Sequence, residues 1–566
     1  MVKDSIFKNK RILMICRETY CKPLWFLAEK LKEDNEVAAF FIMSSECSYT
    51  KTYYNEHTYY EFLKLVPDIK VYDVRDICEQ FIEGMKSGDT PYDLDYLKMI
   101  DENYSHYKNL NMQLMSSQMN TRHYHWRMYW KVTSYAENLY WLELNYKKII
   151  SLLEEFKPDV IFDMDNAELQ RTILCEVCYK KKIPCMTIEY SKFGYYKYAS
   201  FQNSFGIDPY FVRLFDDIKA LPDNEIKESI EYVENYRKEN SIMNKEFAGS
   251  VTSKYEKDSL IWIARVMHGK IEYFYDMDIR KKNLKLKKKS PMLYAPSLPY
   301  IRYYLEEELK KRYLYGKNKY FEDPVPGEDY VFMPLHLIPE SSVFVKASYY
   351  VDELNLIEQV SKALPIGWRL YVKEHQAMLG ERGFEFYKKV REIHNVRLVQ
   401  INYYKDPKPW IANAKGVVTI TGTAAYEAAL LGKRSIIFGN VPFALIDGIT
   451  RVRSFDELHD AIRGFGPVDS LHSAASYIEA VKRAGSPVKI FELMDDADAI
   501  FSGKKERTQE FDDMLNELVD FYEKGYANYQ KALDGGYFIS DIPVEEHWGT
   551  PSQKRNDYGK CDHKQA

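Results

Sequence analysis

The chain has 566 residues, more than one compact domain usually contains, so we expect two or three domains. Its 79 basic and 84 acidic residues leave a net charge of −5, and 46% of its residues are hydrophobic. This balance argues against a polybasic nucleic-acid-binding protein and against a disordered chain. Aromatic residues make up 15%, and the 48 tyrosines outnumber the 25 glycines, so many side chains join an apolar ring to a polar tip.

The N-terminus predicts neither a signal peptide nor a membrane anchor. Residues 1–10 are polar, and no stretch approaches the roughly 18 apolar residues of a spanning helix, so we expect a cytoplasmic protein. Cys175 and Cys178 form the one close cysteine pair, and no second pair or histidine cluster accompanies them. We therefore predict a buried helix face at these two thiols and no zinc site.

The first half of the chain predicts an α/β domain over residues 1–290 with helical insertions. It opens with a strand at 11–16, a helix at 24–31 and a strand at 36–43. A helical, aromatic insertion is predicted over about 59–154. Sheet sequence resumes with a strand at 159–163, a helix at 168–181 and a strand at 184–189, and a second helical insertion follows over 216–289.

The second insertion ends in a basic run. Residues 280–289 read RKKNLKLKKK. A solvated helix face explains such a run, and so does contact with an anionic lipid or an anionic acceptor glycan. The sequence leaves both interpretations open.

The second half predicts another α/β domain over residues 329–503, after a linker at 291–328 that ends in Pro324-Val-Pro-Gly327. Strands are expected at 329–333, 369–372 and 396–399, with a helix at 384–393. Residues 416–438 read as strand, tight polar turn, helix and strand, with Gly432 at the helix C-terminus. A C-terminal helix at 504–541 and a polar tail at 542–566 complete the chain.

Polar side chains follow three predicted strands of this second domain. Ligands of open α/β sheets bind beyond the carboxyl ends of the strands. The turn Thr421-Gly422-Thr423 opens a helix N-terminus, which suits phosphate oxygens, and Glu427 could accept hydrogen bonds from the hydroxyls of a ribose. The other candidates at these ends are His336, Glu340, Lys373 and His375. Taken singly, each residue could equally be a helix cap or a structural histidine.

Three segments within residues 330–447 carry a resemblance to a known family: PLHLIPESS, LPIGWRLYVKEHQAMLGER and VVTITGTAAYEAALLGKRSIIFG. They resemble the C-terminal half of bacterial capsule-polysaccharide biosynthesis proteins, a family that includes Kdo transferases using a CMP-sugar. Weaker similarity covers residues 159–194. The resemblance implies a GT-B-like α/β fold, in which two Rossmann-like domains face a cleft and the second domain holds the nucleotide-sugar donor.

The resemblance also implies roles for single residues. Lys373 and His375 match the family's Lys-Glu-His-Pro motif, whose histidine contacts the nucleotide, and Gln376 replaces its proline. The turn Thr421–Thr423 matches the family's phosphate-binding turn, and Glu427 matches its acidic residue on the following helix. His336 and Glu340 match the Pro-Leu-His and Pro-Glu segment.

In this architecture the catalytic group usually comes from the first domain. The predicted strand end DMDNAELQR, residues 163–171, makes Asp165 and Glu168 the first candidates for a catalytic carboxylate, with Glu18 third. Arg17, Arg171 and Lys192 are expected to line the cleft. As alternatives, Asp165 could cap the following helix, and Glu168 and Arg171 could form a surface ion pair.

No Asp-x-Asp motif falls in a donor-facing turn, so we predict metal-independent transfer with no cofactor beyond the nucleotide-sugar substrate. His336, Lys373, His375 and the helix N-terminus would then neutralise the leaving phosphate. The chain has neither a P-loop lysine motif nor GxGxxG, which argues against a kinase and a dehydrogenase.

The sequence therefore predicts a glycosyltransferase that builds a bacterial surface polysaccharide on a growing or lipid-linked glycan acceptor. Peripheral contact with the inner membrane or with assembly proteins is expected, and nucleic acid is not. The alternatives are a teichoic-acid-type phosphotransferase using a CDP-polyol and a non-catalytic assembly partner. The tyrosines of residues 59–146 and 190–198 fall in the predicted acceptor domain, where rings could stack on sugars or simply pack between helices.

Overall fold

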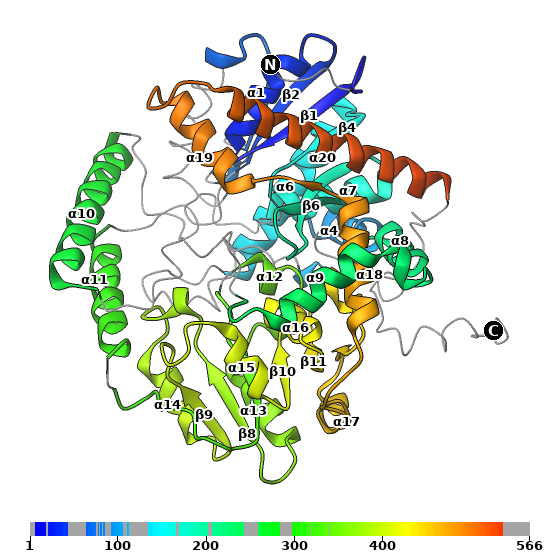
Figure 1. Cartoon of the computed structure of the whole chain (residues 1–566). Helices are drawn as coiled ribbons and strands as arrows, with labels where there is room; N and C mark the ends of the chain where they lie inside the picture. The colour runs from blue at the N-terminus through cyan, green and yellow to red at the C-terminus, as the bar shows by residue number, and fades with distance from the viewer. Residues whose placement is uncertain are drawn as a thin grey trace.

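The computed structural model describes residues 6–17, 21–42, 64–74, 92–105, 110–112, 134–165, 169–201, 207–242, 258–283, 297–316, 318–338 and 340–535, with a few single residues between 77 and 84. Two mainly parallel sheets, each covered by helices, lie one above the other (Figure 1). The predicted α/β class with two Rossmann-like units is confirmed.

The first sheet has seven strands in the order β13-β6-β5-β4-β1-β2-β3. They are β1 (Arg11–Cys16), β2 (Glu36–Phe41), β3 (Lys70–Asp73), β4 (Val160–Phe162), β5 (Cys185–Tyr190), β6 (Tyr196–Ser200) and β13 (Ser486–Pro487). The neighbouring strands β5, β4, β1, β2 and β3 are parallel to one another. Strand β6 is antiparallel to β5, and β13 is antiparallel to β6. The strand order reverses between β1 and β4, where Leu13 pairs with Ala38 on one side and Ile161 on the other.

The second sheet has six parallel strands in the order β12-β11-β10-β7-β8-β9. They are β7 (Tyr330–Pro334), β8 (Arg369–Lys373), β9 (Val396–Val399), β10 (Gly416–Thr419), β11 (Ser435–Ile437) and β12 (Ile449–Arg451). Here the order reverses between β7 and β10. This is the doubly wound order of nucleotide-binding sheets.

Helices from both ends of the chain cover the first sheet. They are α1 (Lys22–Leu31), α4 (Leu94–Asn103), α6 (Tyr135–Phe156), α7 (Leu169–Lys181), α8 (Pro209–Lys219), α9 (Lys227–Lys238), α18 (Leu471–Ala484), α19 (Ile490–Phe501) and α20 (Gln509–Asp534). A capping box of Ser134 and Glu137 starts α6, whose Trp141 is fully buried in one core. Helices α18 and α20 close the core on the opposite face.

Helices of the second unit are α12 (Ser341–Phe344), α13 (Glu353–Ala363), α14 (Phe384–Glu392), α15 (Pro407–Asn413), α16 (Thr423–Leu430) and α17 (Leu458–Arg463). Short 3₁₀ turns include η5 (Gln376–Met378) and η6 (Pro442–Leu445). Helices α10 (Leu260–Asn283) and α11 (Ser297–Leu314) lie together at the left edge of the molecule in Figure 1.

The structure departs from the predicted organisation in three places. Strand β3 lies inside the insertion predicted to be helical, because four residues at a sheet edge leave little pattern in the sequence. Helix α11 lies in the predicted linker. Strand β13 pairs with β6, so the chain returns to the first unit before residue 486 and not after 503. Much of 59–154 and the whole tail 542–566 lie outside the described residues.

Two smaller expectations can be compared with the structure. Cys175 and Cys178 lie on one face of α7 and are fully buried in the core of the first unit, as predicted. Among the described residues, no helix is long and apolar enough to cross a membrane.

Candidate functional site

The candidate site lies where the strand order of each sheet reverses. In the second unit, His336 follows β7 and Thr421 follows β10; in the first, Arg17 follows β1 and Asp163 follows β4. Ligands of doubly wound sheets bind in the crevice at this point, because connections leaving in opposite directions open a gap there. The predicted candidates of each unit therefore converge, although dozens of residues separate them in the sequence.

His336 lies beneath the turn that opens α16. Its Nε2 accepts a hydrogen bond from the Thr421 N–H at 3.3 Å and lies 3.1 Å from the Thr419 hydroxyl. Its Nδ1 lies 3.4 Å from a Glu353 oxygen, which also accepts the His336 backbone N–H at 2.7 Å. Because His336 is buried with both ring nitrogens engaged by protein groups, we interpret it as holding the turn and not as contacting the donor directly.

The turn itself is packed so closely that one position requires glycine. The Gly422 N–H donates to the Thr419 hydroxyl at 3.1 Å, and a Cβ at Gly422 would overlap that oxygen and lie 3.2 Å from His336 Nε2. The Thr421 hydroxyl donates to the Ser342 carbonyl at 2.9 Å, whereas Thr423, the first residue of α16, is exposed. The exposed start of α16 is thus the part of the turn that a ligand can reach.

Lys373, His375 and Glu427 surround this helix start. Burial lowers the pKa of Lys373 to about 8, although Glu374 and Glu427 oppose the shift. Burial raises the pKa of Glu427 to about 7, against the effects of Thr423 and of two lysines, one of them Lys192 from the first unit. The charge of Lys192 in the first unit therefore acts on Glu427 in the second.

His375 is oriented by its own loop. Its Nδ1 accepts the Ala377 N–H at 3.2 Å, which leaves Nε2 to carry the proton. Burial, with further contributions from His336 and Lys373, lowers the pKa of His375 to about 4, so the ring is neutral at pH 7. We expected His375 to neutralise a phosphate; in this state it can instead donate a hydrogen bond to one.

The loop has a defined shape with Gln376 at the position where the resembling capsule-biosynthesis family has proline. Gln376 begins η5, which His375 caps. The buried Met378 ends this turn, and its sulfur accepts the Ile338 N–H at 3.4 Å. The cap and this sulfur contact hold the loop against the end of β7.

Sequence reasoning missed the buried ion network below these loops. Arg382 is fully buried, and its Nη2 lies 2.5 Å from Glu353 Oε2 and 2.9 Å from the His336 carbonyl. Its Nε donates to Glu374 at 2.9 Å, and Glu374 also accepts the His375 N–H at 2.7 Å. Although burial opposes ionisation, Arg382 and His336 hold the pKa of Glu353 below its usual value. The Lys-Glu-His motif was the one signal that pointed to any of these residues.

In the first unit, Arg171 forms ion pairs with Asp163 and Asp165, and Arg17 forms a further ion pair with Asp165. Arg171 donates to both oxygens of Asp163, at 2.6 and 2.8 Å, and both residues are buried. Burial raises the pKa of Asp163 to about 7, although Arg171 opposes this. Asp165 lies 3.2 Å from Arg17 and 3.5 Å from Arg171, and its side chain keeps 29% exposure. Arg171 is therefore not part of a surface ion pair, and Glu18 and Glu168 lie outside the described residues.

The ends of β5 and α12 bring the two units into contact. Lys346, just after α12, lies 2.6 Å from Glu189 of β5, and both side chains are buried. Lys192 follows β5 with a positive φ of 65°. Glu340 is exposed, and its carboxylate accepts the Ser342 hydroxyl at 2.6 Å; the Ser342 carbonyl in turn accepts the Thr421 hydroxyl.

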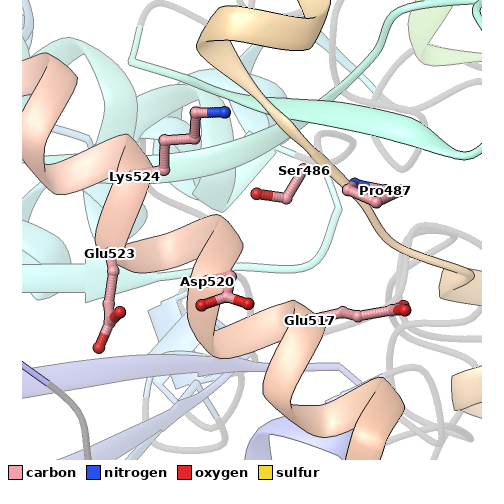
Figure 2. Close-up of a pocket in the computed structure, with 6 residues that line it drawn as sticks. All are labelled: Ser486, Pro487, Glu517, Asp520, Glu523 and Lys524. Atoms are coloured by element: carbon pink, nitrogen blue, oxygen red, sulfur yellow. The ribbon is translucent and has the colours of Figure 1, made fainter.

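A separate pocket of about 420 Å³ lies between α20 and β13 (Figure 2). Ser486, Pro487, Glu517, Asp520, Glu523 and Lys524 line it. Three carboxylates beside one lysine would repel an anionic nucleotide, so we do not place the donor there. Within the described ranges, no group of three or more histidine, cysteine or acidic residues is arranged to hold a metal ion.

In the comparisons with known proteins, only solved structures match this chain. No family model matches the sequence, and no curated protein matches it. The chain is similar to a Thermosulfurimonas dismutans KpsC, a β-Kdo 2,7 transferase, at 12% identity over 58% of this chain and 79% of that one, with a TM-score of 0.26.

Two further similar structures contain bound UDP. S. aureus MnaA with UDP matches at 8% identity over 88% of this chain and 98% of that one, with a TM-score of 0.26. The Methanocaldococcus jannaschii UDP-GlcNAc 2-epimerase with UDP-GlcNAc and UDP matches at 10% identity over 83% and 99%, with a TM-score of 0.25. At these values we base no functional argument on the likenesses.

Proposed function

We propose that this protein is a glycosyltransferase that moves a sugar from a nucleotide-activated donor, such as a CMP-sugar, to a growing or lipid-linked surface glycan. One observation carries the proposal: the exposed start of α16, Lys373, His375 and Glu427 lie at the strand ends beside the reversal of the second sheet, and the charge of Lys192 in the first unit acts on Glu427. These groups suit the parts of a nucleotide-activated sugar: its phosphates, its ribose and the negative charge that develops on the leaving phosphate.

Each group has a proposed role in donor binding. The backbone N–H groups at the start of α16 bind phosphate oxygens, and Lys373 and Lys192 supply positive charge. Glu427 accepts hydrogen bonds from the ribose hydroxyls, and His375 Nε2 donates to the phosphate or ribose. Because these groups stabilise the leaving phosphate, transfer proceeds without a metal ion, and activity in excess chelator is the result that we expect.

The catalytic carboxylate comes from the first unit. Asp165 is the described candidate, since it is partly exposed at the end of β4 and its position is fixed by Arg17 and Arg171. It would remove the proton from the acceptor hydroxyl in an inverting transfer. Glu168 and Glu18 remain further candidates for the same role.

Calorimetric titration with CMP, CDP, UDP and their sugar conjugates tests the donor class. Binding of a nucleotide sugar supports the proposal. Tight binding of CDP-glycerol without binding of any nucleotide sugar would replace it with a CDP-polyol phosphotransferase. Absence of binding to every nucleotide would favour a non-catalytic assembly partner.

Variants separate binding from catalysis. His375→Ala and Glu427→Ala should weaken nucleotide binding about tenfold or more, whereas Asp165→Ala and Glu168→Ala should lower turnover with donor affinity nearly unchanged. His459→Ala, at an exposed histidine of α17, is the matched control. Equal losses of donor affinity in all four variants would show that the roles of the two units are misassigned.

A further inference from the structure

His336 lies between a buried carboxylate and the turn that opens α16, and its two ring nitrogens have different partners. On one side, Nε2 lies 3.3 Å from the Thr421 backbone nitrogen and 3.1 Å from the Thr419 hydroxyl. On the other side, Nδ1 lies 3.4 Å from a Glu353 oxygen. His336 is 7% exposed and Glu353 is 1% exposed, so protein groups, and not solvent, determine where the ring carries its proton.

The partners of Nε2 fix the tautomer of the ring. A backbone N–H can only donate a hydrogen bond, so the Thr421 N–H requires Nε2 to be an acceptor. The Thr419 hydroxyl accepts the Gly422 N–H at 3.1 Å and can donate its own proton to the same ring nitrogen. The ring proton must then lie on Nδ1, where it faces the Glu353 carboxylate.

Glu353, the first residue of α13, serves three donors. Its Oε1 accepts the His336 backbone N–H at 2.7 Å and faces the ring proton, and its Oε2 lies 2.5 Å from Arg382 Nη2. Although burial opposes ionisation, Arg382 and His336 keep the pKa of Glu353 below its usual value. A carboxylate can accept from all three donors, whereas a carboxamide has one oxygen and would place a donor of its own against one of them.

The same contacts decide which N–H groups of the helix start are left for a ligand. Side chains below the turn take up the N–H groups of Thr421 and Gly422, and the Ala425 N–H donates to the Gly422 carbonyl at 3.2 Å. A phosphate group at this helix start would therefore bind the two N–H groups between them, at Thr423 and Ala424. The shape of the turn sets the direction of these two donors.

We propose that Glu353 is a positioning residue for the start of α16: it keeps the ring proton of His336 on Nδ1, so that Nε2 accepts from the turn and the turn presents the next N–H groups to phosphate. Glu353 acts through His336 and is too deeply buried to touch the ligand itself. The binding of phosphate by α16 rests on the proposed function, whereas the state of the ring and of the turn does not.

Two measurements on the ligand-free full chain test the ring and the turn. In protein labelled with ¹⁵N-histidine, the signals of His336, assigned by their loss in His336→Gln, should show a proton on Nδ1 and none on Nε2. Hydrogen exchange followed by mass spectrometry should show protection of residues 419–427. Glu353→Gln should introduce the other tautomer and speed exchange of this turn about tenfold or more, because one donor of the network loses its acceptor.

Calorimetric titration with CMP measures the consequence for binding. Glu353→Gln should weaken CMP binding about tenfold or more, since the N–H groups of the helix start are no longer held in one direction. His336→Gln, whose side-chain oxygen can still accept from Thr421, should bind CMP more tightly than His336→Leu, which has no acceptor. This partial rescue distinguishes a positioning role from a general effect on packing.

Glu328→Gln is the matched control. Glu328 accepts hydrogen bonds from Arg397 and Tyr371 just before β7, at the opposite end of the strand that precedes His336, so its loss should leave the tautomer, the turn and CMP affinity unchanged.

A proton on Nε2 of His336 in the original chain would overturn the proposal. So would unchanged exchange or unchanged CMP affinity in Glu353→Gln, or equal changes in Glu328→Gln. If Glu353→Gln does not fold, the tautomer of the original chain and the comparison of His336→Gln with His336→Leu decide the question. Absence of CMP binding by the original chain would instead contradict the proposed function, and the two ligand-free measurements would still decide this inference.

Discussion

Gly422 illustrates how a single residue shapes the donor turn. It precedes α16 with φ −71° and ψ 151°, angles that any residue can adopt, so its need for glycine comes from packing and not from backbone strain. Gly383 precedes α14 with the same angles, and a Cβ there would meet nothing within 4 Å. The two glycines therefore have the same backbone conformation and differ in the atoms that surround them.

We predict that Gly422→Ala lowers the free energy of unfolding by about 1–3 kcal/mol, because the added methyl must displace the Thr419 hydroxyl. Nucleotide affinity should fall with it. Gly383→Ala should change stability by less than about 0.5 kcal/mol. Urea titration measures both, and equal effects in the two variants would contradict the packing argument.

Glu427 makes stability depend on pH. Its pKa in the folded protein is raised to about 7, above the value of roughly 4.3 expected when the chain is unfolded. The folded state therefore holds this proton more tightly, and its contribution to stability is present at low pH and lost as the pH rises through about 7.

We predict that Glu427→Gln, which cannot ionise, raises the Tm relative to the original protein more at pH 8 than at pH 5. Thermal unfolding of the ligand-free protein at both pH values measures this difference. Glu358→Gln, at an exposed ion pair on α13, is the control and should show no such trend. A pH-independent difference for Glu427→Gln would refute the assignment.

At the scale of elements, Arg382 connects the ends of two strands. It donates hydrogen bonds to Glu374 after β8 and to the carbonyl of His336 after β7, and it forms an ion pair with Glu353 at the start of α13. Three loops that bear or support the candidate site therefore depend on one buried guanidinium. Its planar donors can bond several oxygens in fixed directions, which lysine could not reproduce.

We predict that Arg382→Met destabilises the protein by about 3–5 kcal/mol, because two buried carboxylates lose their counter-charge. Arg302→Met removes an arginine of similar size from an exposed i,i+4 pair and should cost less than about 0.5 kcal/mol. Chemical unfolding compares them. A loss below about 1 kcal/mol for Arg382→Met would mean that the network does not hold these loops.

At the scale of the whole molecule, the two units are joined by contacts that are distant in sequence. Arg237 of α9 donates to the Leu430 carbonyl of α16 at 2.7 Å, and α18 packs against α9 and α16. The buried pair Glu189–Lys346 joins the units next to the candidate site. The relative position of the two sheets is thus held by polar as well as apolar contacts.

A double-mutant cycle on this pair tests the contact between the units. Lys346→Met and Glu189→Gln should each destabilise, and the double variant should cost less than their sum by about 1–3 kcal/mol, since neither partner is then left as an unpaired buried charge. Urea unfolding of the four proteins measures the coupling. Additive effects would show that the two side chains do not interact in solution.

Much of the fold could be predicted because its signals are local. Strand β1 occupies the predicted residues, and the unit at 416–438 forms the predicted strand, helix and strand. Gly432 adopts φ +72° at the end of α16, as its place in the sequence indicated. Hydrophobic periodicity and helix caps depend on residues that are a few positions apart, so they can be recognised in the sequence alone.

The sequence by itself determined the strand ends and which polar residues follow them, because each lies within its own segment. Only the tertiary structure decided which of these residues meet. His336 reaches Thr421 across 85 positions, Arg382 joins Glu353 and Glu374, and β13 returns to β6. The physical reason is that a buried charge or a sheet edge is satisfied by whichever group the fold brings near, and no local pattern records that partner.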